Sequence, residues 1–168
     1  MTIAAMLALG VAMASSPDLG KREGRCRTDE PGPAIIVDAQ GLKDRRGLLR
    51  LELYPDDDAD FLADDNVLLS AGKTFARTEL PVPATGPASL CIRVPRPGRY
   101  ALSLLHDRNA NRKFDLSGDG IGFPGNPRLT WSRPRAAQAS VTAGPAITHI
   151  AIRLNYRRGL AMRPMEAE

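Results

Sequence analysis

Residues 48–54 read LLRLELY, and in this stretch leucines at every second position alternate with Arg50 and Glu52. Because successive side chains of a β-strand point to opposite faces, the alternation predicts a strand with one buried face. Six other short apolar or β-branched segments carry a similar signal, and turns containing Gly or Pro separate several of them. These segments are residues 34–39, 75–82, 88–94, 100–105, 138–142 and 148–154.

About seven short strands with regular turns predict an all-β fold. We expect a single antiparallel β-sandwich, immunoglobulin-like or transthyretin-like, with one long loop. The turn PRPGR at residues 95–99 predicts a hairpin between the strands on its two sides. The only stretch that suits a helix lies around residues 59–69. The long loop covers residues 107–135, and a loop of this length is usually functional or held by something else.

Composition limits the class of protein. The chain has 168 residues, which fits one domain, and its 15 Gly and 14 Pro disfavour a helix bundle. The formal net charge is +4, which is too small to indicate a strong polyanion binder. A large multidomain enzyme, a coiled coil and a multi-pass membrane protein are excluded. No nucleic-acid partner is expected, because no recognition motif accompanies the weak charge.

Residues 1–14 read MTIAAMLALGVAMA and predict a secretory signal peptide. The uncharged run from Ile3 to Ala14 would reach about 18 Å as a helix, too short for a bilayer core of about 30 Å. It ends in an A-x-A cleavage pattern before Ser15. We therefore expect a periplasmic or secreted protein with no transmembrane span after cleavage. The alternative is that this segment is a buried part of the folded chain.

The mature chain divides into three parts by composition. Residues 15–33 are polar and contain three prolines, so we expect a flexible N-terminal arm. Residues 34–157 are expected to form the sandwich, and residues 158–168 a tail. The two cysteines, Cys26 and Cys91, predict one disulfide in an oxidising compartment. Two unpaired thiols are the alternative.

Several stretches resemble a family of exported bacterial proteins known as domain of unknown function 2141. They are GLKDRRGLLRLELY at 41–54, RPGRYALSLLHDRNANRKFD at 96–115, GDGIGFPGNP at 118–127 and a last alternating strand ending at Tyr156. The resemblance implies a periplasmic or secreted β-sandwich and no known reaction. The family shows His-Asp-x-Asn-x-Asn-Gly after a strand, whereas this chain has Arg112 in place of the glycine.

The segment after His106 carries oxygen side chains at loop positions 1, 3, 5 and 9, as in a calcium loop. Calcium is the one candidate cofactor. The backbone carbonyl of Lys113 would be the seventh-position ligand, and Asp119 would replace the missing Glu. Three basic neighbours and the lack of Gly at position 6 predict weak binding. The alternative is an Asx-rich turn without metal. The candidate ligands are Asp107, Asn109, Asn111, Lys113, Asp115 and Asp119.

Two further segments have a weaker signal. Six aspartates between residues 56 and 65 are interpreted as a solvent-facing acidic loop, with a contribution to a metal site as the alternative. The glycine-rich segment 118–127 either caps the core through Ile121 and Phe123 or forms a ligand-contact loop. In the second case exposed aromatic side chains and arginines would bind a sugar or an anionic polymer. Those contact residues are Phe123, Arg128, Trp131, Arg133 and Arg135.

No enzyme motif is complete. The GKT at residues 72–74 lacks the glycine of a phosphate loop, because that position is Val67. There is no Gly-x-Ser-x-Gly, and His106 is better explained as a structural histidine at a strand end. We therefore expect a non-catalytic protein of the bacterial envelope that binds an envelope protein or a polysaccharide. The alternative class is a carbohydrate-binding or polymer-binding module.

Overall fold

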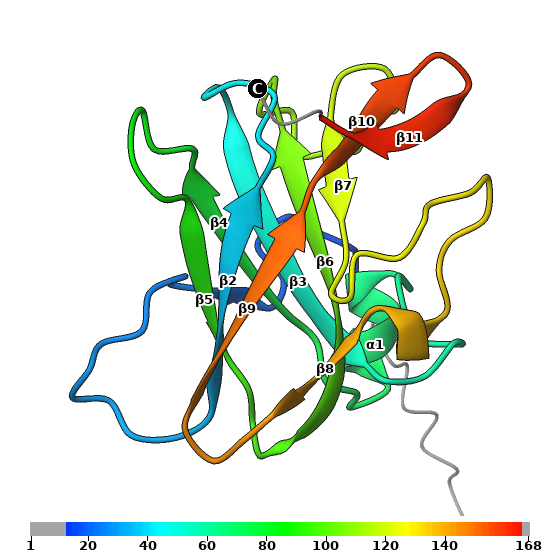
Figure 1. The fold of residues 1–168 in the computed structure, drawn as a ribbon. Helices are drawn as coiled ribbons and strands as arrows, with labels where there is room; N and C mark the ends of the chain where they lie inside the picture. Colours follow the sequence, from blue (N-terminus) through cyan, green and yellow to red (C-terminus); the bar gives the residue numbers. More distant parts are fainter. Residues whose placement is uncertain (1–12, 166–168) are drawn as a thin grey trace, which may run out of the picture.

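A computed structural model describes residues 13–165, whose strands form two sheets (Figure 1). The larger sheet contains β1 (Lys21–Arg22), β3 (Leu48–Pro55), β4 (Ala76–Pro81), β6 (Gly98–Asp107), β7 (Gly120–Gly122), β8 (Ser140–Ala143), β10 (Asn155–Arg158) and β11 (Ala161–Pro164). The smaller sheet contains β2 (Ala34–Gln40), β5 (Ser89–Arg93) and β9 (Ile147–Arg153). Within the described residues the orders are β1-β4-β3-β6-β7-β10-β11, with β8 also on β6, and β5-β2-β9.

Each of the seven predicted segments contains a strand, and the all-β fold with two sheets is confirmed. The helix α1 (Asp65–Ser70) falls at the end of the one stretch that suited a helix. The strand pairing is not purely antiparallel, however, because β1–β4 and β2–β9 are parallel. The expected wholly antiparallel pairing is therefore wrong. The strands β3 to β8 lie between β2 and β9 in the sequence, so no tight turn constrains these two strands to run in opposite directions.

The predicted hairpin at residues 95–99 is also wrong. β5 pairs with β2 in the smaller sheet, whereas β6 pairs with β3, β7 and β8 in the larger one. The turn therefore carries the chain from one sheet to the other. Pro95 and Pro97 offer a physical reason, because proline has no N–H to donate to a strand ladder.

The main core lies between the sheets. Leu49, Leu51 and Leu53 of β3 are almost completely buried, as the alternation predicted, and belong to one cluster with Ile35 and Val37 of β2. The apolar side chains of β6 and β9 extend this cluster. Its position explains why leucines alternate on β3, since only one face of the strand meets the opposite sheet.

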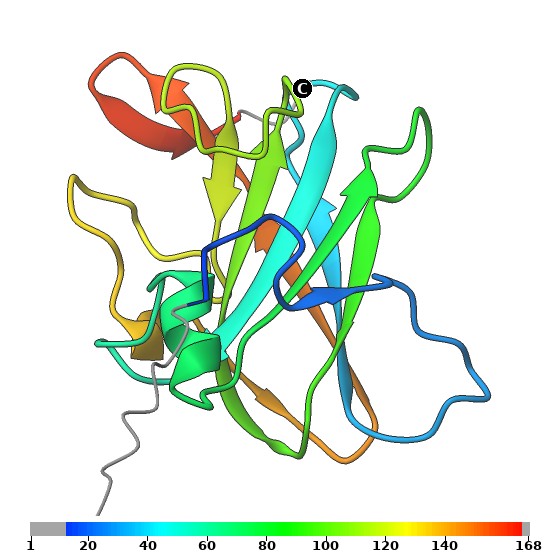
Figure 2. The ribbon, with the colours of Figure 1, turned by 180° about the vertical axis from the view of Figure 1, so that it is seen from behind.

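A second apolar cluster covers the other face of the larger sheet. Tyr54 lies at its centre, with its ring 5.6 Å from that of Phe61 and 5.4 Å from that of Phe75. The helix α1 and the short 3-10 helix η1 (Ala136–Gln138) lie over this end of the sheet (Figure 2). This cover also buries Glu52, which the alternation assigns to the polar face; its carboxylate accepts hydrogen bonds from Tyr54 Oη (2.6 Å) and Arg77 Nε (2.7 Å).

Residues 15–33, expected to form the N-terminal arm, connect the two sheets at the β4 and β5 edge. The carbonyl of Gly20 accepts the N–H of Arg77 in β4 (2.8 Å), and the carbonyl of Gly24 accepts the N–H of Cys91 in β5 (2.9 Å). Cys26 and Cys91 form the predicted disulfide, with a Cα–Cα distance of 5.7 Å. The arm is therefore attached to both layers of the sandwich.

The expected tail at residues 158–168 contributes a strand, because β11 pairs with β10 in a hairpin. Gly159 has φ of 64° at the tip, a conformation that suits the two-residue turn. The expected signal peptide at residues 1–14 lies almost entirely outside the described residues. In the part of the chain that the structure covers, no helix has the length and apolar character needed to cross a bilayer.

Candidate functional site

The loop after β6 begins with a turn built from side-chain oxygens. Asp107 is buried, and its carboxylate accepts the N–H groups of Asn111 (3.2 Å) and Arg112 (2.6 Å). Asn109 Oδ1 accepts the N–H of Asn111 at 3.1 Å, and Asn111 Oδ1 accepts that of Lys113 at 2.8 Å. These bonds are those of an Asx-rich turn, in which short polar side chains satisfy the backbone.

The end of the same loop returns to its start through Asp119. This buried carboxylate accepts the N–H of Arg108 through Oδ1 and that of Asp115 through Oδ2, both at 2.9 Å. Asp115 Oδ2 in turn accepts the side-chain N–H groups of Asn109 (2.8 Å) and Asn111 (2.6 Å). The five predicted side-chain ligands are thus gathered in one hydrogen-bonded loop, and Lys113 joins them through its backbone.

Arg112 adopts the left-handed conformation that favours glycine, with φ of 62°. Three contacts hold it there. Its backbone N–H donates to Asp107, its carbonyl accepts a hydrogen bond from Arg50 Nη1 (2.9 Å), and its Nε forms an ion pair with Glu79 (3.2 Å). The departure from glycine therefore leaves the turn geometry in place and adds a positive charge to it.

The donor types in this loop fit a hard cation, but its surroundings are basic. Carboxylate and amide oxygens keep a second lone pair after accepting one hydrogen bond, and such oxygens are the ligands that calcium prefers. The guanidinium of Arg108 forms an ion pair with Asp44 through Nε (2.9 Å) and Nη2 and bonds the carbonyl of Gly118 (3.0 Å). The described residues contain no group of three or more His, Cys, Asp or Glu placed to hold a metal. A cation here would depend on the amide and carbonyl oxygens.

His106, one residue before this loop, is completely buried in a hydrogen-bonded network. Its Nε2 lies 2.8 Å from the carbonyl of Arg46, and its Nδ1 lies 2.7 Å from Tyr156 Oη, which also accepts the N–H of Lys43 (3.1 Å). A carbonyl only accepts, so Nε2 carries the proton and Tyr156 donates to Nδ1. Burial lowers the pKa of His106 and raises the pKa of Tyr156 to about 12. His106 therefore has the structural role expected of it.

The long loop and the β10–β11 hairpin enclose a cleft of about 640 Å³. Both segments rise from the same edge of the larger sheet, next to β7 (Figure 1). A cleft of this size is in the range of small-molecule sites. Its lining is mainly apolar, with three arginines and two hydroxyl side chains. The residues are Leu62, Phe114, Leu116, Ile121, Phe123, Arg128, Leu129, Thr130, Trp131, Ser132, Arg133, Pro134, Arg157, Leu160, Ala161 and Met162.

Four of the five predicted contact residues line this cleft, namely Phe123, Arg128, Trp131 and Arg133. Trp131 is 81% exposed, as expected for a contact residue. The expectation that Phe123 is exposed is wrong: it is 3% exposed and packs against Phe61 at a ring distance of 5.8 Å. Phe123 therefore forms part of the floor of the cleft and also caps the second apolar cluster.

Sequence reasoning missed the opposite wall of the cleft. Arg157 and Met162 face each other across the hairpin pair and both line the cleft, together with exposed Leu160. The signal was present, because residues 155–164 contain two short segments around Gly159, which suits a tight hairpin turn.

The aspartates at residues 56–65 match their interpretation as a solvent-facing loop only in part, because Asp57, Asp58 and Asp64 are exposed whereas Asp65 is buried. Asp65 is 4% exposed and pairs with Arg77 (3.3 Å). Asp56 accepts from Arg99 Nε (2.7 Å), and this hydrogen bond lowers the pKa of Asp56. Asp58 Oδ1 accepts the N–H of Ala136 (2.7 Å), which anchors η1. These carboxylates attach the segment around α1 to the larger sheet.

The fold and the cleft together define a small all-β protein with two sheets and a ligand-sized cleft beside the larger one. The chain belongs to a family described as an uncharacterized protein conserved in bacteria, DUF2141, which matches residues 37–151. The match runs from β2 into β9 and confirms the resemblance found in the sequence. The β10–β11 hairpin lies beyond it. No curated protein and no solved structure matches the chain.

Proposed function

We propose that this protein is a non-catalytic binding module of the bacterial envelope, exported to the periplasm or beyond, whose ligand site is the cleft. The observation that carries the proposal is the position of Trp131. This tryptophan is the only one in the chain, and it lines the cleft while 81% of it is exposed. A large exposed aromatic side chain in an apolar concave site is typical of a contact residue.

The chemistry of the lining supports binding rather than catalysis. Among the described residues that line the cleft there is no His, Cys, Asp or Glu, the side chains that most often act as acids, bases or metal ligands. A topology of the immunoglobulin or transthyretin-like kind is part of the same proposal, because sandwiches of this kind carry binding sites on their end loops.

The sequence suggested two kinds of envelope ligand for such a site, a polysaccharide and a partner protein. Trp131 and the arginines would suit a sugar, through ring stacking and hydrogen bonds, which favours the polysaccharide alternative. The aliphatic part of the lining, which includes Leu116, Leu129 and Leu160, offers no hydrogen bonds and suits an apolar group.

Calcium is a secondary part of the proposal. The loop that forms one wall of the cleft begins at the oxygen-rich turn between Asp107 and Asp119. An ion held by Asp107, Asn109, Asn111, Asp115 and the carbonyl of Lys113 would add its binding free energy to the stability of that loop. Arg108, Arg112 and Lys113 would keep its affinity low by charge repulsion. The ion would have no chemical role in the cleft.

The test of the binding site uses 1-anilinonaphthalene-8-sulfonate, an anionic aromatic probe that fluoresces in apolar sites and accepts energy from tryptophan. We expect the folded protein to bind it with energy transfer from Trp131. Leu160→Asp should weaken this binding, because it places a carboxylate in the apolar lining at a position that is 78% exposed and tolerant of change. Val67→Asp is the matched control, since Val67 on α1 is also exposed and lies outside the cleft. Equal binding by both variants would refute the proposed site.

A further inference from the structure

A second hollow of about 390 Å³ adjoins the cleft. The two share Arg128 and Leu129 from the long loop and Ala161 and Met162 from β11. These four residues therefore form the boundary at which the two hollows meet. The cleft and the second hollow together form the two ends of one elongated concave region.

The two ends differ in chemistry. The larger end is mainly apolar, with Phe114, Leu116, Ile121, Leu129 and Leu160 in its lining, although three arginines also line it. The smaller end is polar and basic, because its lining includes Asn126, Arg128, Arg153, Asn155 and Arg163. Among the described residues that line either end, no carboxylate offsets the arginines.

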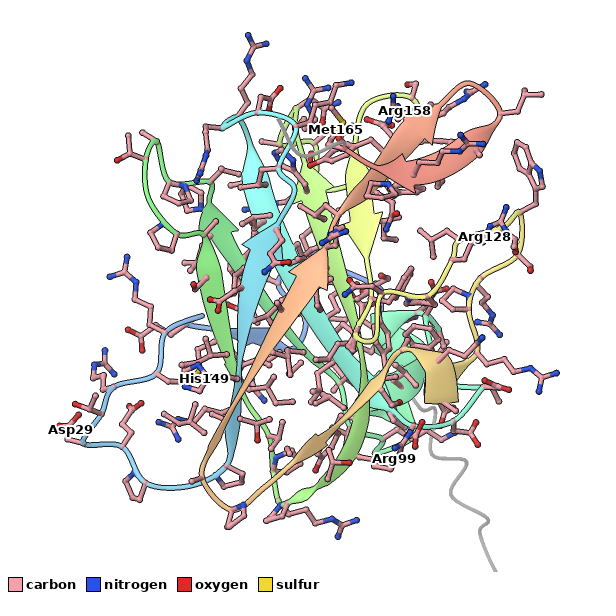
Figure 3. The ribbon with its side chains drawn as sticks, viewed as in Figure 1. Asp29, Arg99, Arg128, His149, Arg158 and Met165 are labelled. Carbon is pink, nitrogen blue, oxygen red and sulfur yellow. A yellow bond between two sulfur atoms is a disulfide. The ribbon has the colours of Figure 1, made fainter. Side chains whose placement is uncertain are left out.

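The arginines differ in their partners. Arg133 is bound to the carbonyls of Phe61 (2.5 Å) and Asp58 (2.9 Å), and Arg157 Nε is bound to the carbonyl of Gly159 (3.1 Å). These two are therefore part of the wall. Within residues 13–165, Arg128 and Arg163 form no hydrogen bond or ion pair through their guanidinium groups. Arg128 lies on the loop beside the β10–β11 hairpin, where the two ends meet (Figure 3).

We infer that the cleft binds a single-chain amphipathic anion, with its alkyl chain in the larger end and its carboxylate or phosphate head at Arg128 and Arg163. This inference rests on the proposed function and names its ligand class. A guanidinium matches the geometry of a carboxylate or phosphate through two parallel hydrogen bonds. An alkyl chain matches the aliphatic lining. A sugar does not, because aliphatic side chains offer no hydrogen bonds to its hydroxyl groups. A wholly apolar ligand would leave the basic end unused.

The test measures Trp131 emission while monomeric ligands are added below the concentration at which they form micelles. Dodecyl phosphate and dodecanoate carry both features, dodecanol carries the chain alone, and inorganic phosphate carries the charge alone. We expect the two anions to bind at least tenfold more tightly than dodecanol, and inorganic phosphate to leave the emission unchanged. Vesicles of phosphatidylglycerol, measured by co-sedimentation, present the same chemistry as a membrane surface, and we expect no co-sedimentation.

The variant Arg128→Gln removes the charge from the junction of the two ends. We expect this variant to bind both anions about tenfold more weakly or worse, as for the loss of a charged hydrogen bond, and to bind dodecanol with unchanged affinity. Arg96→Gln makes the same change of charge at an exposed arginine outside both ends and should bind like the unchanged protein.

Each contrary result has a distinct meaning. Equal affinity for dodecanol and the anions, or an Arg128→Gln variant that binds normally, would overturn the inference while the cleft remained a binding site. Binding to vesicles without binding of the monomers would also overturn it. An oligosaccharide that changed Trp131 emission where the anions did not would replace it with the sugar alternative. If 1-anilinonaphthalene-8-sulfonate also failed to bind, the proposed function itself would fall.

Discussion

Tyr156 Oη and His106 Nδ1 lie 2.7 Å apart in the interior, and this hydrogen bond connects β10 to the end of β6. β10 forms one wall of the cleft, and the loop after β6 leads to the other. The contact therefore fixes the relative position of the two walls. Its integrity is accessible to experiment through stability and through pH.

Removing the Tyr156 hydroxyl should destabilise the protein without changing its fold. Tyr156→Phe leaves the Nδ1 of His106 and the N–H of Lys43 without their partner, and such buried losses cost about 1–3 kcal/mol. Urea denaturation gives the free energy of unfolding. Tyr100→Phe is the control, because the Tyr100 hydroxyl only donates to the partly exposed carbonyl of Arg96 and should cost less. An equal cost for both variants would contradict the role of the network.

Acid should destabilise the protein as His106 is protonated. Burial lowers the pKa of His106 below its ordinary value of about 6.5, so the unfolded chain binds this proton at a higher pH than the folded protein. The contribution of His106 to stability is therefore fully present above about pH 6.5 and is lost as the pH falls towards the pKa of His106 in the folded protein. Denaturation at a series of pH values checks this. His149→Gln, at an exposed position, should keep the same dependence, whereas His106→Gln should reduce it.

The disulfide should account for a measurable part of the stability. Cys26 and Cys91 are 65 residues apart, and the chain-entropy argument gives about 4 kcal/mol for a loop of that size before any strain. We expect the reduced protein, or a Cys26→Ala and Cys91→Ala double variant, to unfold at a lower temperature by differential scanning calorimetry. Titration of the native protein without reductant should find no free thiol. Two free thiols would contradict the bridge.

Calcium should raise the melting temperature if it binds the oxygen-rich turn. The increase is measured between EDTA and millimolar calcium. Asp107→Asn should remove this increase, although it will also lower stability in EDTA because Asp107 binds two backbone N–H groups. Arg112→Gly removes a positive charge from the turn while suiting its positive φ, so it should enlarge the calcium effect. No increase in either the unchanged protein or Arg112→Gly would mean that these residues only shape the turn.

The sequence predicted the strands well where the alternation of side chains was regular. Leu49, Leu51 and Leu53 identify β3 because one sheet face meets a core. The alternation could not predict the burial of Glu52, because the segments that cover this residue, including α1 and residues 13–20, come from distant parts of the chain. β7 was missed because Gly120–Gly122 is too short to show a period.

For a similar reason, the sequence predicted only one of the two walls of the cleft. Trp131, Arg128 and Arg133 follow a loop whose composition suggested contacts. The wall formed by Arg157, Leu160 and Met162 was assigned to a tail, since Asn155–Arg158 is polar and short and its partner strand is equally short. Pairing of β10 with β7 brings that wall to the loop, and this long-range contact leaves no local signal.

The most direct test of the cleft as the binding site is nuclear magnetic resonance mapping of backbone amides while dodecyl phosphate is added. We predict chemical-shift changes in residues 114–134 and 155–164, the two walls, and none on the outward face of β2, β5 and β9. Changes confined to the smaller sheet, or spread evenly over the molecule, would contradict the account.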